Sequence, residues 1–251
     1  MILCLQGVYN MKDKIILVIP AYNEEENILN TYKSIMKYNT EKKTNYDVIV
    51  INDCSTDKTS EICHQNKIPV IDLVHNLGIG GAVQTGYKYA YKNGYDIAVQ
   101  FDGDGQHDVR YVKNVVDPII NGQADLVIGS RFVKKIDTFQ SSAARRMGIK
   151  VISSFMKFAT GKKVYDTTSG FRAVSKEIIK DFSISYPNEY PEPVTTAEIL
   201  KKDYKVSEVS VEMKEREGGT SSIHTWKTVY YMLNVCLALL VIKVRRYKRC
   251  Q

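Results

Sequence analysis

Short apolar runs alternate with segments of helical spacing through the first half of the chain, and this alternation constrains the fold more than any other feature. Runs with the length and continuous apolar character of buried strands lie at residues 15–19, 47–51, 70–74, 97–101 and 124–128. Between them, apolar spacing and capping residues predict helices at 24–36, from a cap at 55–57 to 62, at 82–92 and at 110–120. This order predicts an α/β fold with a mostly parallel sheet flanked by helices.

The second half of the chain is less regular. Helical spacing predicts a helix at 144–159, and alternating residues predict a strand at 206–213. We see no internal repeat and no low-complexity linker, so we expect one domain over residues 11–222, followed by a C-terminal helix over 223–251. The length of 251 residues suits one large domain, and 44% hydrophobic and 25% charged residues argue against disorder of the whole chain.

Net charge and cysteine content indicate which partners and which redox environment suit the protein. The net charge of +7 suits polyanionic partners such as an anionic membrane surface or phosphate-bearing substrates. The five cysteines are scattered and form no C-x-x-C pair, which argues against a disulfide framework and against a zinc site. A reducing, cytosolic setting fits this cysteine usage best.

Residues 229–242 are almost entirely apolar and are followed directly by basic residues: Lys243, Arg245, Arg246, Lys248 and Arg249. A helix over the apolar stretch spans about 21 Å, short of the roughly 30 Å hydrocarbon core of a bilayer. We therefore predict an amphipathic or apolar helix that lies at an anionic membrane surface with its basic end at the headgroups. The alternative is a helix buried in an oligomer interface.

Two carboxylates, Asp102 and Asp104, follow the fourth predicted strand and are separated by Gly103. In a parallel sheet, ligands bind beyond the carboxyl ends of the strands, so this turn would face a ligand. Mg²⁺ and Mn²⁺ prefer oxygen ligands and accept phosphate oxygens as the rest of their shell. The turn is therefore a candidate metal site, and Gln106 or His107 could add a ligand or orient one.

Other polar residues follow the neighbouring strands. Asp53 ends the second strand, where a carboxylate can accept hydrogen bonds from a ribose or a base. The glycine-rich segment that begins at Gly78 resembles a dinucleotide loop only superficially, because it follows the third strand; its glycines would let a helix N-terminus approach a donor. Arg131, Arg145 and Arg146 are candidate phosphate ligands, since guanidinium groups bind phosphate oxygens bidentately.

The combination of motifs resembles the inverting glycosyltransferases of family two, which have the GT-A fold, a Rossmann-like fold that binds nucleotide-diphosphate sugars. Within that family it is most similar to the polyprenyl-phosphate sugar synthases, the group that includes dolichol-phosphate mannose synthase. The matching segments run in family order: IPAYNE at 19–24, NDCSTD at 52–57, NLG at 76–78, DGDGQH at 102–107, GSR at 129–131, RRMG at 145–148 and TSGFR at 168–172.

The resemblance implies a role for each matching residue. Those that would bind the nucleotide sugar are Pro20, Ala21, Tyr22, Glu24, Asp53, Gly78, Asp102 and Gly103. Those that would bind Mg²⁺ or Mn²⁺ are Asp102, Asp104 and Gln106. The catalytic set would be Asp104, Arg131, Arg145, Arg146 and Ser169, with Arg131 and one of Arg145 or Arg146 on the acceptor phosphate. The chain departs from some relatives at Ile149 and Lys150, one helical turn after the arginines, where those relatives have a serine.

The expected function is transfer of a hexose, with inversion, from a nucleotide-diphosphate sugar to undecaprenyl or dolichyl phosphate, feeding cell-envelope polysaccharide or glycan synthesis. The enzyme would work at the cytoplasmic face of the cell membrane as a peripheral or interfacially anchored protein, alone, as a homo-oligomer or with a small membrane-protein partner.

Two alternatives remain. The first is transfer directly to a hydroxyl of a glycan or lipid-linked saccharide, for which Glu192 or Glu198 would be the general base. The second is a non-catalytic basic binding module, which would not need paired carboxylates. Aromatic-rich basic segments are not clustered on the predicted sheet, so we expect no nucleic-acid partner.

Overall fold

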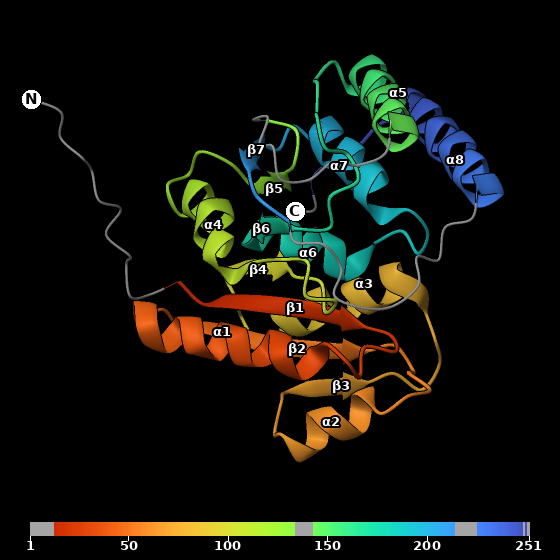
Figure 1. Ribbon diagram of the computed structural model, residues 1–251. Coiled ribbons are helices and arrows are strands. Elements are labelled where there is room, and N and C mark those ends of the chain that lie inside the picture. Colours follow the sequence, from red (N-terminus) through yellow and green to blue (C-terminus); the bar gives the residue numbers. More distant parts are fainter. Residues whose placement is uncertain (1–12, 134–142, 214–224, 248, 250–251) are drawn as a thin grey trace, which may run out of the picture.

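A computed structural model describes residues 13–133, 143–213, 225–247 and 249, with only the backbone of helical residues 143–146 and 225–229. Its strands are β1 (Ile15–Ala21), β2 (Tyr46–Asn52), β3 (Val70–Asp72), β4 (Ile97–Gln100), β5 (Leu126–Ser130), β6 (Arg172–Ser175) and β7 (Val206–Ser210). They form one sheet in the order β3-β2-β1-β4-β6-β5-β7 (Figure 1). Strand β6 runs antiparallel to β4 and β5, whereas the other pairs are parallel, so the predicted mostly parallel sheet is confirmed.

Helices cover both faces of the sheet. One face carries α1 (Ile28–Lys42), α2 (Thr59–Gln65), the short 3₁₀ helix η1 (Val109–Tyr111) and α4 (Val112–Ile120). The other face carries α3 (Gly78–Lys92), α6 (Lys176–Ile184) and α7 (Pro191–Lys201). Alternate residues of β1 supply the two cores: Ile16 and Val18 pack with α3, while Leu17 and Ile19 pack with α1, as the period of two in a strand requires.

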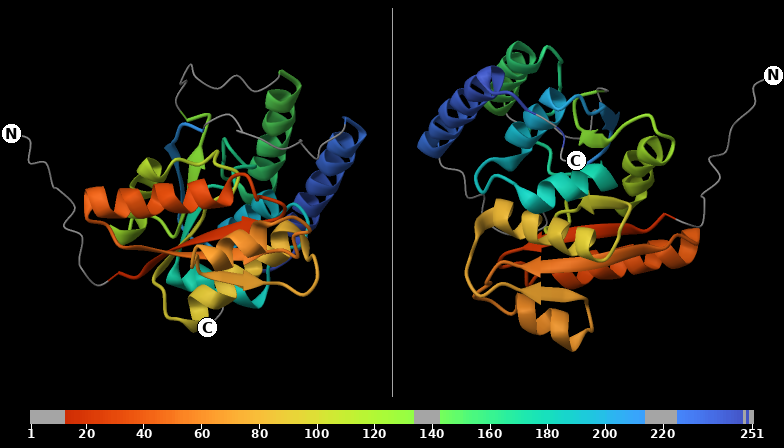
Figure 2. Two further views of the ribbon diagram at one scale, coloured as in Figure 1. Left: turned by 60° about the horizontal axis from the view of Figure 1, so that its bottom comes forward. Right: turned by 180° about the vertical axis from the view of Figure 1, so that it is seen from behind.

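Helices α5 (Ala143–Thr160) and α8 (Thr225–Val244) form an outer pair that packs on α7. Both views show them side by side, at the end of the molecule farthest from α2 (Figures 1 and 2). Val235, Leu239 and Ile242 of α8 are buried in the same core cluster as α3 and α6. The C-terminal helix is thus continuous with the main core. None of the described helices combines the length and apolar character needed to cross a membrane.

Helices α1 and α3 begin farthest from their predicted starts, and α2 begins at Thr59, after the predicted cap at 55–57. Helix α1 begins at Ile28 instead of residue 24, because Asn23 has a left-handed backbone (φ 55°) and residues 22–27 form a loop. That loop is bonded to the next one: Asn23 N donates to Ser55 Oγ, and Thr56 N donates to Asn23 Oδ1. Helix α3 begins earlier than predicted, at Gly78.

The antiparallel strand β6 is the main element that sequence patterning does not indicate, together with α6 and α7. It has only four residues, and the first, Arg172, is a charged residue that is fully buried. In register, Arg172 lies opposite Gln100 of β4 and Ile128 of β5. Because β6 runs in the opposite direction, the loop before it reaches the same sheet edge as the loops after β1, β2, β3, β4 and β5.

Candidate active site

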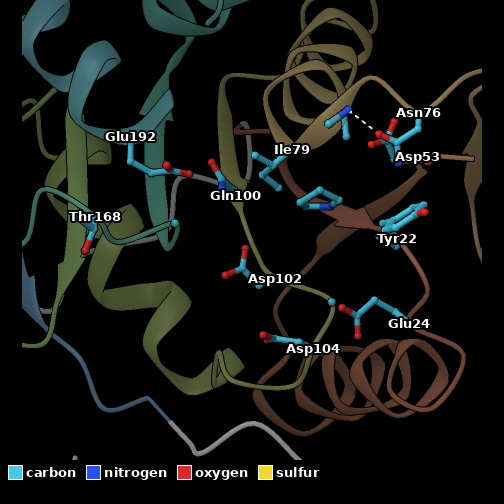
Figure 3. Close-up of a pocket in the computed structure, with 16 residues that line it drawn as sticks. Tyr22, Glu24, Asp53, Asn76, Ile79, Gln100, Asp102, Asp104, Thr168 and Glu192 are labelled. Atoms are coloured by element: carbon cyan, nitrogen blue, oxygen red, sulfur yellow. Dashed lines mark hydrogen bonds between the residues drawn. The ribbon is translucent and has the colours of Figure 1, made fainter. Parts of the chain in front are cut away.

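A cavity of about 560 Å³ opens at the carboxyl edge of the parallel strands. It is lined by Pro20, Ala21, Tyr22, Glu24, Asp53, Asn76, Gly78, Ile79, Ala82, Gln100, Asp102, Gly103, Asp104, Thr168, Gly170 and Glu192. All eight residues that the sequence assigns to the nucleotide sugar are in this set, and so is Asp104. In Figure 3, Tyr22, Asp53 and Asn76 lie on one side, Thr168 and Glu192 lie on the other, and Asp102 lies between them.

Asp53 is held at the end of β2 by three backbone-linked hydrogen bonds. Its N–H donates to the Ala21 carbonyl at 2.9 Å, and its carboxylate Oδ1 accepts from Leu77 N at 2.7 Å. Its own carbonyl accepts from Asn76 Nδ2 at 3.1 Å. The chain segments at the ends of β1, β2 and β3 are therefore joined through one buried residue, which gives this end of the cavity a defined shape.

The turn Asp102–Asp104 is braced from below by His107. The His107 ring is buried, and its Nδ1 accepts a hydrogen bond from Asp102 N at 2.9 Å. Nδ1 is therefore unprotonated, and Nε2, which carries the proton, lies 3.3 Å from Asp102 Oδ2. Burial lowers the pKa of His107 to about 4, although Asp104 opposes the shift. His107 is thus a neutral residue that fixes the backbone at Asp102 and lies beside its carboxylate.

The donor chemistry of the turn fits a divalent cation. Asp102 and Asp104 offer carboxylate oxygens to the cavity, and the backbone of the turn is fixed by Thr31 Oγ1, which donates to the Gly103 carbonyl at 3.2 Å. Within the part of the chain that the structure describes, no cluster of three or more His, Cys, Asp or Glu could hold a metal alone. The rest of a coordination shell would thus have to come from ligand oxygens or water.

Gln106 remains a predicted ligand. Its backbone N donates to Asp104 Oδ1 at 3.0 Å, which closes the turn, and its side chain is not among those that line the cavity.

Arg131 makes a bidentate ion pair inside the protein. Its Nε and Nη2 donate to the two carboxylate oxygens of Asp166 at 2.8 Å each, and Nη2 also donates to Thr168 Oγ1 at 3.1 Å. The two side chains are 9% and 0% exposed. Burial opposes the charge, but Asp166 outweighs it and raises the pKa of Arg131. Arg131 therefore fixes the loop before β6 against β5. The side chains of Arg145 and Arg146 lie outside the described residues.

Ser169 does not face the cavity. Its hydroxyl is buried and donates to the Gly129 carbonyl at 2.6 Å, while its neighbours Thr168 and Gly170 line the cavity wall. Glu198, an alternative general base, is also outside the lining set; its carboxylate accepts a hydrogen bond from Tyr247 Oη at 3.3 Å.

The sequence motifs assign no role to Gln100, include Arg172 only as the last residue of the matching segment 168–172, and offer Glu192 only as an alternative base. Gln100 and Glu192 line the cavity, and the buried guanidinium of Arg172 donates to the backbone carbonyls of Ser169 and Glu192. Burial raises the pKa of Glu192, while nearby Arg172 favours its charged form. The available signal for Gln100 was a polar residue at the end of an apolar strand; nothing local indicated that Glu192 would lie opposite it.

Comparison with known proteins agrees with this architecture. Residues 16–183 match the family model "Glycosyl transferase family 2". The chain is 33% identical, over 89% of its length and 96% of the relative, to UDP-N-acetylglucosamine–dolichyl-phosphate N-acetylglucosaminyltransferase of Methanococcus voltae. It is 28% identical to polyprenol monophosphomannose synthase of Mycolicibacterium smegmatis, over 83% of this chain and 80% of the relative.

A solved structure shares the fold. Glucosyl-3-phosphoglycerate synthase from Mycobacterium tuberculosis, in complex with Mn²⁺, uridine diphosphate and phosphoglyceric acid, has a TM-score of 0.68 at 19% identity, over 93% of this chain and 80% of that one. Given the family match over more than half of its length and a relative of 33% identity across most of it, the chain belongs to glycosyl transferase family 2.

Proposed function

We propose that this protein transfers a hexose from a nucleotide-diphosphate sugar to a polyprenyl phosphate, with inversion at the anomeric carbon. The observation that carries the proposal is the order of groups along one cavity: Asp53 and Tyr22 at one end, the Asp102–Asp104 turn in the middle, and Glu192 at the other end. A nucleoside, a metal-bound diphosphate and a sugar follow the same order in the donor. The named activities of the Methanococcus and Mycolicibacterium relatives support the choice of acceptor.

The residues of the chain would divide the work between binding and orientation. Asp53 and Tyr22 bind the nucleoside, and Asp102 and Asp104 hold Mg²⁺ or Mn²⁺ against the diphosphate. When bound, that cation would neutralise the charge that develops on the departing nucleoside diphosphate. His107 keeps the Asp102 carboxylate oriented. A phosphate acceptor is already anionic at neutral pH, so this route needs no strong general base.

The acceptor phosphate needs cationic partners near the sugar end. Arg131 is bonded to Thr168, a residue of the cavity wall, so its charge lies behind that wall. We assign the direct phosphate contact to Arg145 or Arg146 and give Arg131 the task of holding the loop. Ser169 would likewise act by fixing that loop to Gly129.

An exposed apolar face on α8 supports a membrane-bound acceptor. Tyr230, Leu233, Leu237, Val241 and Val244 are each about 60% exposed or more, and they recur at three- and four-residue spacing on one side of the helix. We call these five residues the α8 face. Basic residues follow at once, including the exposed Arg245 and Arg246. An apolar stripe ending in cations matches the interface of an anionic bilayer, so we propose that the α8 face docks there, on the cytoplasmic side.

A hydroxyl acceptor is the second candidate, and one observation favours it. The Glu192 carboxylate lines the cavity, and burial raises its pKa, as expected for a general base that takes a proton from a sugar hydroxyl. Such an enzyme would form a glycosidic bond, which resists mild acid, instead of an acid-labile glycosyl phosphate.

The test is incubation of the purified protein with radiolabelled nucleotide sugars, Mn²⁺ or Mg²⁺, and undecaprenyl or dolichyl phosphate. We expect a labelled lipid that mild acid hydrolyses. A labelled product that is stable to mild acid would instead establish the hydroxyl acceptor. If wild type, like Asp104→Asn, transferred no labelled sugar from any donor, both candidate activities would be overturned.

A further inference from the structure

Gln100 presents a buried hydrogen-bond acceptor to the cavity. The residue is 1% exposed at the end of β4, and its side chain is part of the cavity lining. Among the described residues, its Oε1 atom has no hydrogen-bond partner. Buried polar atoms in native proteins almost always have partners, so an unpartnered atom at a cavity wall points to a bound water or ligand that supplies the missing one. A donor group on a ligand would satisfy Oε1.

Glu192 lies directly opposite Gln100. Figure 3 shows the two side chains pointing toward one another at the end of the cavity that is farthest from Asp53, and a hydrogen bond from the Gln100 side chain favours the charged form of Glu192. Glu192 is positioned by Arg172, whose Nη1 donates to the Glu192 carbonyl at 3.4 Å and to Thr195 Oγ1 at 3.1 Å. The other side of the same guanidinium donates to the Ser169 carbonyl at 2.8 Å. A fully buried arginine thus ties the start of α7 to the loop before β6.

Space at this corner is kept open by a glycine. A Cβ atom on Gly170 would lie 3.1 Å from Gln100 Nε2 and 3.3 Å from both carboxylate oxygens of Asp102. Any side chain at 170 would therefore press on Gln100 and on the metal-binding turn together. The side chains of Gln100, Glu192 and Asp102 therefore border one volume, which the lack of a side chain at Gly170 leaves open.

The charge of the corner selects the chemistry of its ligand. Glu192 is a carboxylate in this corner, and Asp102 would already be engaged by the cation. A neutral group with O–H or N–H donors fits between them, because the Glu192 carboxylate and Gln100 Oε1 accept hydrogen bonds. With a diphosphate at the Asp102–Asp104 turn, the next group along the donor is its sugar.

We propose that Gln100 and Glu192 form the subsite that binds the hexosyl ring of the donor, in which Gln100 Oε1 accepts a hydrogen bond from a ring hydroxyl or an acetamido N–H. The assignment rests on the proposed function for the existence of the donor, and it makes this pair the residues that discriminate between sugars. A site built to hydrogen-bond one hydroxyl rejects analogues that lack it, because its buried acceptor is then left unpaired.

Titration calorimetry with Mn²⁺ and without acceptor tests the subsite separately from transfer. Wild type is first titrated with UDP- and GDP-linked glucose, N-acetylglucosamine and mannose, and with UDP and GDP alone. Gln100→Met and Glu192→Gln keep side-chain size but remove the acceptor or the charge. For the best donor, we expect each variant to lose about tenfold or more in affinity, the worth of one hydrogen bond in a buried site. Affinity for the nucleoside diphosphate should stay within about twofold of wild type.

Glu198→Gln is the matched control, since it makes the same change on the same helix outside the cavity. It should leave both affinities unchanged. Equal losses for the nucleotide sugar and the nucleoside diphosphate in Gln100→Met would show a purely structural role and overturn the subsite. Wild type that binds the nucleoside diphosphate but gains nothing from any sugar would also overturn it, with the nucleotide site intact.

Donor analogues provide a measurement that does not depend on how well a variant folds. Nucleotide sugars lacking single hydroxyls are titrated against wild type, and one position should weaken binding by about tenfold. The same omission should have little further effect in Gln100→Met, because the partner atom is already gone. Uniform sensitivity to every hydroxyl, unchanged in the variant, would contradict the assignment. A wild-type protein that binds no nucleotide at all would instead refute the proposed function itself.

Discussion

His107 Nδ1 accepts a hydrogen bond from the backbone N–H of Asp102 at 2.9 Å, while Nε2 of the same ring lies 3.3 Å from the Asp102 carboxylate. One neutral imidazole thus fixes the backbone of a candidate metal ligand and lies beside its carboxylate. Residues that orient metal ligands in this way typically change metal affinity by about 10- to 100-fold when replaced.

We therefore expect His107→Leu to weaken Mn²⁺-dependent nucleotide binding by roughly tenfold or more, because Asp102 loses both contacts. His107→Asn retains an acceptor and a donor on a shorter side chain and should retain part of the affinity. Titration of Mn²⁺ in the presence of nucleoside diphosphate measures the effect. Metal affinity that is unchanged in the folded His107→Leu protein would contradict the positioning role.

The Arg131–Asp166 ion pair should stabilise the fold through its geometry as well as its charge. Removing one partner of a buried pair leaves the other uncompensated, so Arg131→Ala should lower the free energy of unfolding by about 3–5 kcal/mol. Arg131→Lys keeps the charge but loses the two parallel hydrogen bonds, and it should fall between wild type and Arg131→Ala. Chemical denaturation measures both.

Arg110 provides the contrast, because its pair with Asp108 is formed by a side chain that is 70% exposed. Arg110→Lys should not move the denaturation midpoint measurably. Equal losses of stability in the Arg110 and Arg131 variants would show that burial does not explain the contribution of the Arg131–Asp166 pair.

Two glycines in helices should respond to alanine in opposite ways. A Cβ on Gly86 of α3 would meet Val18 Cγ1 of β1 at 2.1 Å, so Gly86→Ala forces the helix off the sheet and should destabilise the protein by about 1–3 kcal/mol. A Cβ on Gly148 of α5 meets only the flexible Met232 Sδ at 3.3 Å. Gly148→Ala should therefore be neutral or stabilising by up to about 1 kcal/mol, through helix propensity. Thermal unfolding of the two variants decides.

The α8 face should control membrane binding without controlling stability. Leu233 and Leu237 are each 60% exposed, so replacing both with glutamate should leave the unfolding midpoint almost unchanged while abolishing sedimentation with phosphatidylglycerol vesicles. Leu239, on the buried side of the same helix, should behave in the reverse sense: Leu239→Ala is expected to lose about 2–5 kcal/mol of stability. Vesicle binding by the double glutamate variant equal to that of wild type would exclude the α8 face as the docking surface.

The Cys63 thiol should be unreactive in the native protein. Burial, and then the charge of Asp72, raises its pKa to about 11, so almost none of it is thiolate at pH 8. Because the folded-state pKa lies above the unfolded value, this thiol contributes stability that is fully present below about pH 9 and is lost as the pH rises toward 11. Peptide mapping after brief iodoacetamide treatment at pH 8 should find Cys54, which is half-buried in a loop, labelled before Cys63. Urea should abolish the difference.

Much of the candidate site was predictable because its residues lie directly after the ends of strands. Apolar runs followed directly by Ala21–Glu24, Asp53 and Asp102–Asp104 already imply a parallel sheet with these groups at its carboxyl edge, since all parallel strands end on the same side. The burial of alternate β1 residues on two faces follows from the same pattern. The first residues of α1 and α3 were harder to predict, because they depend on hydrogen bonds between loops, such as the bond between Asn23 and Ser55. The local spacing of apolar residues does not indicate such bonds.

The amino-acid sequence by itself determined the class of fold and indicated the candidate metal-binding turn and the end of the cavity that we propose for the nucleoside, because short-range periodicity and strand-end chemistry encode them. Only the tertiary structure decided which residues complete the other end. There the antiparallel strand β6 brings Arg172 beside Gln100, and α7 brings Glu192, 92 positions after Gln100 in the chain, to the same end of the cavity. It also showed that His107 braces Asp102 and that Arg131 pairs with Asp166. Such contacts form because the chain reverses direction and buries these residues together. The sequence around each residue does not indicate which distant residue it will contact.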